Sequence, residues 1–151
     1  MKSYLIIAVA SVLTLSAAPG LRAHCQVPCG IYSDDTVLKD LHTHQATISK
    51  AMEQIAKLSK KPGENANQLT RWVVNKEEHA TKIQQTMTQY FLAQRVKLTE
   101  ADSNNKAYIK KISLIHQIIV HAMKCKQSTD LDAAAKLHQS IALFTKAYQT
   151  K

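Results

Sequence analysis

"YIKKISLIHQIIVHA", residues 108–122, is the stretch that decides the fold. Its apolar side chains recur at intervals of three and four residues over four turns, a spacing that places them on one side of an α-helix. We therefore predict a helix here that is well buried along that side. The side chains that carry the pattern are Tyr108, Ile112, Ile115, Ile119 and Ala122.

Similar patterns extend outward from this stretch in both directions. Toward the N-terminus, one pattern starts after Ser33, a good N-cap residue, and ends at the Lys60–Gly63 turn; a second spans residues 69–91 and fades near residues 96–98. A polar break at residues 102–105 separates it from the central stretch. Toward the C-terminus, residues 129–132 resemble a capping box, with Thr129 as the cap, and open a fourth helix that reaches residue 148.

Little in the sequence would interrupt these helices. After residue 33 the only proline and the only glycine are Pro62 and Gly63, which adjoin in a single turn. A chain of 151 residues is one domain's worth. Four amphipathic helices with short connections predict an all-α protein, an up-and-down four-helix bundle over residues 33–151.

The first 23 residues have the layout of a secretory signal peptide. Lys2 gives a positive start, residues 4–18 are almost wholly apolar, and residues 16–20 break the apolar run. The run is short for a membrane-spanning helix, which needs about 20 residues. We expect cleavage after Ala23, which would make His24 the first residue of an exported, periplasmic or secreted protein. An uncleaved anchor is the alternative, because Leu21 is not the small residue preferred before such a cut.

The chain is basic, with a formal net charge of +9 that falls to +7 when Lys2 and Arg22 leave with the leader. A basic protein can attract nucleic acid, anionic lipid or small anions. Nucleic acid is the least favoured partner, because the lysines are scattered and the chain is expected to be exported. No membrane attachment is expected after the leader is removed.

The predicted bundle offers few signs of an internal cofactor. No Glu-x-x-His pair recurs on two helices, as a di-iron site would need, and no Cys-x-x-Cys-His is present for haem. Three methionines at helical positions are interpreted as core fillers: Met52, Met87 and Met123. The helical histidines are interpreted as surface or hydrogen-bonded core residues; they are His42, His44, His79, His116, His121 and His138.

Metal-ligand chemistry concentrates in "HCQVPCGIY", residues 24–32, which we call the N-terminal hook. A freed His24 offers its amine and imidazole, the next amide belongs to Cys25, and Cys29 adds a second sulfur. A planar set of two nitrogens and two sulfurs suits nickel(II) or copper(II) better than zinc or hard ions. A Cys25–Cys29 disulfide, with Cys125 left over, is the alternative.

The hook resembles that of the nickel superoxide dismutase family, whose pattern is His-Cys-x-x-Pro-Cys-Gly-x-Tyr; every fixed position is present. "RWVVNKEEHATKIQQTMTQYF", residues 71–91, is similar to the second helix of that family. The resemblance implies a homohexamer of four-helix bundles with one nickel ion per subunit. The implied activity is the disproportionation of superoxide to oxygen and hydrogen peroxide by Ni(III)/Ni(II) cycling.

The resemblance also implies roles for individual hook residues. The His24 amine, the Cys25 amide and the sulfurs of Cys25 and Cys29 would be planar nickel ligands, with the His24 imidazole as the axial ligand. Tyr32 would stand over the open face, ordering water and limiting access; anchoring the loop to the bundle is its alternative role. Pro28 would shape the loop.

Outside the conserved pattern of the family, the sequence leaves several roles open. Gln26 stands where aspartate is frequent in the family. Asp40 and His79 are the candidates to hold the axial imidazole, and Tyr90 is a candidate second tyrosine near the site. Two other functions compete with the enzyme: an exported nickel or copper carrier without catalysis, and a purely structural bundle. The leader could also be a pro-segment cut in the cytoplasm.

Overall fold

The computed structural model describes residues 33–150, so the leader and the N-terminal hook lie outside the described residues. Four long helical segments account for most of this range: α2 (Asp34–Leu58), α3 (Pro62–Gln85) with its continuation η1 (Thr86–Arg95), α5 (Asn105–Gln127) and α6 (Leu131–Gln149). A short helix, α4 (Thr99–Ser103), connects η1 to α5. No strand occurs within residues 33–150.

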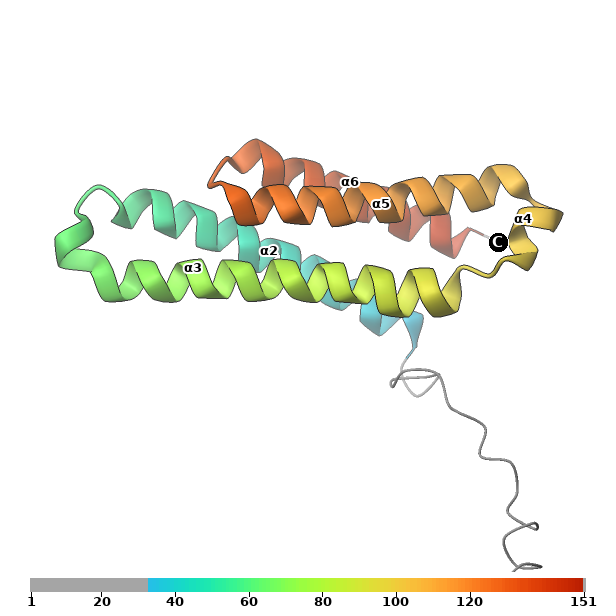
Figure 1. Ribbon diagram of the computed structural model, residues 1–151, viewed down its shortest axis with the longest axis horizontal. Coiled ribbons are helices and arrows are strands. Elements are labelled where there is room, and N and C mark those ends of the chain that lie inside the picture. Colours follow the sequence, from blue (N-terminus) through green and yellow to red (C-terminus); the bar gives the residue numbers. More distant parts are fainter. Residues whose placement is uncertain (1–32, 151) are drawn as a thin grey trace, which may run out of the picture.

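The helices pair as two hairpins that lie side by side (Figure 1). One hairpin is α2 with α3, the other is α5 with α6, and the hairpins meet through α3 against α5 and α2 against α6. The predicted all-α four-helix bundle is therefore confirmed. None of the helices described is long and apolar enough to cross a membrane.

The predicted start of the first helix is confirmed, the second helix starts earlier than predicted, at Pro62, and one cap residue is corrected. Ser33 is the N-cap of α2, and its hydroxyl accepts a hydrogen bond from the amide of Thr36 at 3.4 Å. The prediction of Thr129 as the cap of the last helix is wrong: the carboxylate of Asp130 accepts from the Asp132 amide at 3.0 Å. An aspartate side chain reaches the backbone two residues on, so α6 begins one residue later than the capping-box pattern predicts.

The core is a single apolar cluster to which every long helix contributes. Met52 and Met87 are fully buried, as predicted, but Met123 is 44% exposed, so its assignment to the core is wrong. On α5 the neighbouring Ala122 is fully buried, and successive helical residues point about 100° apart, which turns Met123 toward solvent. The central stretch is buried chiefly through Leu114, Ile115, Ile118, Ala122 and Cys125, while Tyr108, Ile112 and Ile119 are only partly buried.

The segment η1 is a π-helix, which the spacing of apolar residues did not predict. Its wider turn hydrogen-bonds residues five apart, as the amide of Val96 does to the carbonyl of Phe91 at 2.9 Å. In this turn two consecutive aromatic residues, Tyr90 and Phe91, are both buried. Phe91 packs edge-on against Phe144 of α6, which leaves Tyr90 on the side of η1 that meets the start of α2.

A buried lysine ties the two hairpins together at the opposite end of the bundle. The Lys76 ammonium on α3 donates to the carbonyls of Cys125 and Lys126 in the last turn of α5, at 2.6 and 2.5 Å, and to the carboxylate of Glu77 at 3.1 Å. Carbonyls at a helix C-terminus lack partners within the helix and attract a positive charge. Lys76 thus fixes the C-terminal turn of α5 against α3.

Candidate metal centre and its base

In the sequence, the hook is followed directly by the first turn of α2. Asp34 in this turn contacts two other parts of the bundle. The hydroxyl of Tyr90 donates to Asp34 Oδ1 at 2.5 Å, and the hydroxyl of Tyr148 donates to Asp34 Oδ2 at 2.7 Å. Tyr90 lies in η1 and Tyr148 in α6. Both oxygens of Asp34 are therefore occupied by groups from two other parts of the fold.

Arg95 completes this arrangement, which we call the Asp34 cluster: Asp34, Tyr90, Arg95 and Tyr148. Arg95 Nη2 donates to the Tyr90 hydroxyl at 2.8 Å, and its guanidinium lies 4.9 Å from the centre of the Tyr90 ring. Arg95 Nε lies 3.0 Å from Asp34 Oδ1. This contact is an ion pair only, because its angles are not those of a hydrogen bond. Arg95 is five residues after Tyr90, so the π-helical turn sets this contact.

The protonation states within the Asp34 cluster follow from these contacts. Burial would raise the pKa of Asp34, but the hydrogen bonds from Tyr90 and Tyr148 and the charge of Arg95 outweigh it and hold this pKa below its usual range. Burial and the hydrogen bond to Asp34 raise the pKa of both Tyr90 and Tyr148. At neutral pH Asp34 is therefore an ionised carboxylate that accepts hydrogen bonds from two neutral phenols and pairs with the positive charge of Arg95.

Three residues predicted near the metal lie within the described range. Tyr90 contacts Asp34, which follows the last hook residue by two positions. Asp40 is exposed on α2, and its charge acts on His44, one turn further along. His79 on α3 pairs with the same residue: His44 Nδ1 and His79 Nδ1 are 2.9 Å apart. The remaining predicted site residues, His24, Cys25, Pro28, Cys29 and Tyr32, lie outside the described residues.

His44 is a partner of His79 that was not predicted. Because the contact joins two nitrogens, one imidazole donates its N–H group and the other accepts the hydrogen bond, so at least the accepting ring must be neutral. Burial lowers the pKa of both histidines, and the Lys82 charge lowers both further. The negative charge of Asp40 raises the pKa of His44, and that of Glu78 raises the pKa of His79, but both effects are smaller.

The other helical histidines are surface or hydrogen-bonded residues, as predicted. His138 Nδ1 lies 3.2 Å from the Gln45 side-chain oxygen, and His121 Nδ1 lies 2.9 Å from the Ser140 hydroxyl. His42 meets His138 edge-on, and His116 is exposed. Across residues 33–150, no group of three or more histidine, cysteine, aspartate or glutamate side chains could hold a metal ion.

Cys125 is the one cysteine among the described residues, and its thiol is fully buried. Burial raises the pKa of this thiol to about 11, partly offset by the charge of Lys76. Metals bind the thiolate form, which this environment disfavours. The thiols available to a metal are therefore those of Cys25 and Cys29 in the hook.

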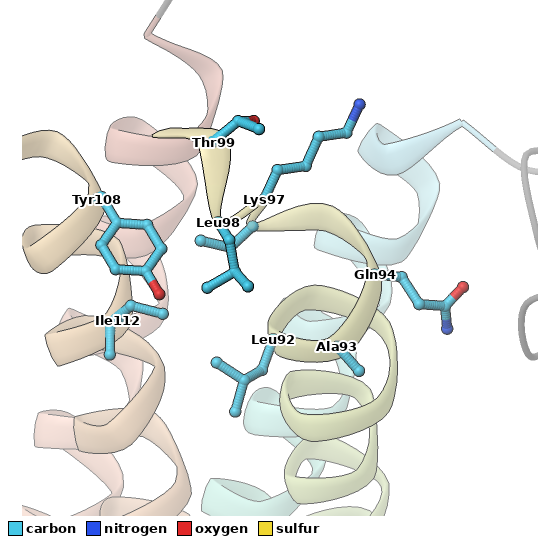
Figure 2. Close-up of a pocket in the computed structure, with 9 residues that line it drawn as sticks. Leu92, Ala93, Gln94, Lys97, Leu98, Thr99, Tyr108 and Ile112 are labelled. Carbon is cyan, nitrogen blue, oxygen red and sulfur yellow. The ribbon is translucent and has the colours of Figure 1, made fainter. Parts of the chain in front are cut away.

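An apolar groove lies between the end of η1 and the start of α5 (Figure 2). Leu92 and Leu98 extend from one side toward Tyr108 and Ile112 on the other. Lys97 is the only charged side chain among the described residues that line it. Without carboxylates, imidazoles or thiols in this lining, the groove is not a metal site.

We expect the His44–His79 pair to make stability depend on pH. Both imidazoles have a folded-state pKa below the ordinary value of 6.5, so the unfolded chain binds protons more readily. Their contribution to the free energy of unfolding is complete above about pH 6.5 and is lost as the pH falls toward the lowered folded-state values. The urea midpoint should therefore fall between about pH 7.5 and about pH 5.5, and should fall less steeply in His44→Gln.

The exposed His116 provides the matched control for this prediction. His116→Gln should keep the steepness of the unaltered protein. Equal steepness in His44→Gln and in the unaltered protein would contradict the role of the pair.

A helical bundle in which no cluster of side chains among residues 33–150 could hold a metal ion, preceded by a segment with two cysteines and a histidine, is the pattern of a metalloprotein with an N-terminal ligand set. The family model described as nickel-containing superoxide dismutase matches residues 20–151, which includes the hook and the bundle. The chain belongs to the nickel-containing superoxide dismutase family. It is accordingly an oxidoreductase with a nickel cofactor. No curated protein and no solved structure matches the chain.

The donor chemistry of the chain fits this cofactor. Two thiols and a histidine lie within six residues of one another, and thiolate and nitrogen donors suit nickel(II). The only other cysteine is buried and resists ionisation. The hook is therefore the part of the chain whose donor atoms fit a nickel ion.

Proposed function

We propose that the mature protein, cut after Ala23, binds one nickel ion through His24, Cys25 and Cys29 and disproportionates superoxide to oxygen and hydrogen peroxide. The observation that carries the proposal is the family match, which spans residues 20–151 and so contains every fixed position of the hook. When bound, nickel would supply the redox step by alternating between Ni(III) and Ni(II), accepting an electron from one superoxide and giving it to the next.

The chain's own residues would hold the ion and control access to it. Cleavage frees the His24 amine, which with the imidazole, the Cys25 amide and the two sulfurs completes the donor set. Thiolate and anionic amide donors push electron density toward the ion, which makes the higher oxidation state accessible. Tyr32 would order water and limit the size of molecules that approach, and ordered water would supply the protons that peroxide requires.

The charge of the chain supports the choice of substrate. Superoxide is a small anion, and the chain carries a formal net charge of +9, or +7 without its leader. A positive surface raises the capture rate of an anion by about tenfold or more at low ionic strength. Turnover should therefore decrease as salt is added.

Export, oligomeric state and the roles of Asp40 and His79 are further parts of this proposal. The apolar leader supports export to a periplasm or beyond, and membership of the family supports a homohexamer. Asp40 and His79 would steady the His24 imidazole, with His44 holding His79 in place through the contact at 2.9 Å. Native mass measurement of the mature protein tests the hexamer directly.

The experiment that tests the function uses protein purified from its native cell. We expect mass spectrometry to find His24 as the first residue, metal analysis to find one nickel per chain, and the same sample to disproportionate superoxide. Nickel or copper without rapid turnover would indicate a metal carrier instead. A Cys25–Cys29 disulfide with no metal would indicate a structural bundle.

A further inference from the structure

The joint between the hook and the bundle is short. Tyr32, the last residue of the hook, precedes Asp34 by two positions. An extended chain advances at most about 3.6 Å per residue, so two residues span about 7 Å. The length of the chain alone therefore keeps Tyr32 within about 7 Å of Asp34.

The Asp34 carboxylate is not needed to start the helix. Ser33 already serves as the N-cap, and its hydroxyl accepts from the Thr36 amide. An aspartate in a first helical turn ordinarily contributes through the helix dipole alone and faces solvent. Asp34 instead binds side chains from η1 and α6, which are 56 and 114 residues away in the sequence.

The contacts of Asp34 restrain this turn in more than one direction. Tyr90 and Arg95 approach Oδ1 from η1, while Tyr148 approaches Oδ2 from the last turns of α6. Asp35 adds a separate link to α6, because Gln149 Nε2 donates to its Oδ1 at 3.0 Å. The side chains of Asp34 and Arg95 remain 33% and 28% exposed, so the cluster lies at the surface of the bundle.

We propose that the Asp34 cluster is a positioning device for the nickel hook, and that Asp34 is its central positioning residue. This inference rests on the proposed function of the hook. By fixing the first turn of α2 to η1 and α6, the cluster sets where Tyr32 and the metal ligands stand relative to the bundle. It adds Asp34, Arg95 and Tyr148 to the residues on which the metal centre depends.

The test compares nickel release from Asp34→Asn with release from the unaltered mature enzyme. Asparagine keeps the size of the side chain but loses the charge and one of the two accepting oxygens. We expect nickel loss to an excess of chelator to accelerate by about 10- to 100-fold, the range found when residues that orient metal ligands are replaced. The electron paramagnetic resonance spectrum of the oxidised enzyme should also broaden or shift, because the ligands would no longer hold one geometry.

A matched control is available on α3. Glu77 pairs with Lys76 at 3.1 Å, and its side chain is 41% exposed, close to the 33% of Asp34. Glu77→Gln removes one charge from an ion pair that lies 13 residues before Tyr90 in the same continuous helical segment, about 20 Å along its axis, and it should leave nickel release and the spectrum unchanged. Tyr148→Phe removes one hydrogen bond of the cluster and keeps the ring; it should change both readouts in the direction of Asp34→Asn, to a smaller degree.

The outcomes separate this inference from the proposed function. A lower thermal midpoint in Asp34→Asn and Tyr148→Phe with nickel release and spectrum unchanged would make the cluster purely structural, and the function would stand. If Asp34→Asn fails to fold, Tyr148→Phe decides by the same two readouts. Absence of nickel from the unaltered mature protein would overturn the function and the inference together.

Discussion

A single alanine added before His24 of the mature chain is expected to abolish nickel binding and superoxide turnover. The added residue converts the α-amine of His24 into a peptide amide, which removes one proposed ligand and displaces the imidazole. We expect nickel affinity and turnover to fall by more than about 100-fold, since replacing residues that only orient ligands already costs about 10- to 100-fold. Metal analysis and a superoxide assay on the same sample measure both effects.

The control for this prediction is the same addition at the other end of the chain. One alanine after Lys151 leaves the hook unchanged and should preserve nickel content and turnover. Full activity in the protein extended before His24 would show that the amine is not a ligand, and the proposed coordination would have to be abandoned.

Serine in place of Cys25 or Cys29 should have an equally large effect. A hydroxyl does not ionise near neutral pH, so either substitution removes a thiolate ligand and the electron density that it supplies. Each variant should lose nickel and show turnover no greater than buffer containing free nickel. Because the bundle does not include these residues, its helical content by circular dichroism should be unchanged.

Cys125→Ser is the matched control, since it makes the same chemical change at the third cysteine. Cys125 is fully buried and its thiol has a pKa of about 11, so it should not contribute to the metal centre. We expect normal nickel content and turnover, with a loss of about 1–3 kcal/mol in the free energy of unfolding because a hydroxyl is buried in an apolar site. Loss of activity in Cys125→Ser would mean that the ligands are wrongly assigned.

The sequence predicted the helices well because their starts and ends depend on local chemistry. Ser33 caps α2 as expected, and α2 ends at Leu58, close to the turn predicted at residues 60–63, although Pro62 and Gly63 are themselves the first two residues of α3. The one misplaced cap, Thr129, had an aspartate as its neighbour, and both residue types cap helices. Met123 was misassigned because the apolar stripe of α5 is broad, and spacing alone did not fix which edge faces the core.

The environment of the candidate site was much less predictable. Tyr90 was singled out by resemblance, but its contact with Asp34 depends on a π-helical turn that apolar spacing does not encode. Tyr148 lies 114 residues from Asp34, and no local pattern links them. The His44–His79 pair likewise required the packing of α2 against α3. Contacts across the bundle arise from tertiary packing, which a single sequence does not reveal.

The hydrogen bond between Asp34 and Tyr148 also has a consequence for biosynthesis. It joins the first helical turn described to one of the last, so a nascent chain that still lacks α6 cannot complete it. The start of α2 then reaches its final place only after synthesis of almost the whole polypeptide. A chain truncated before α6 would accordingly lack one of the hydrogen bonds that fix the first turn of α2.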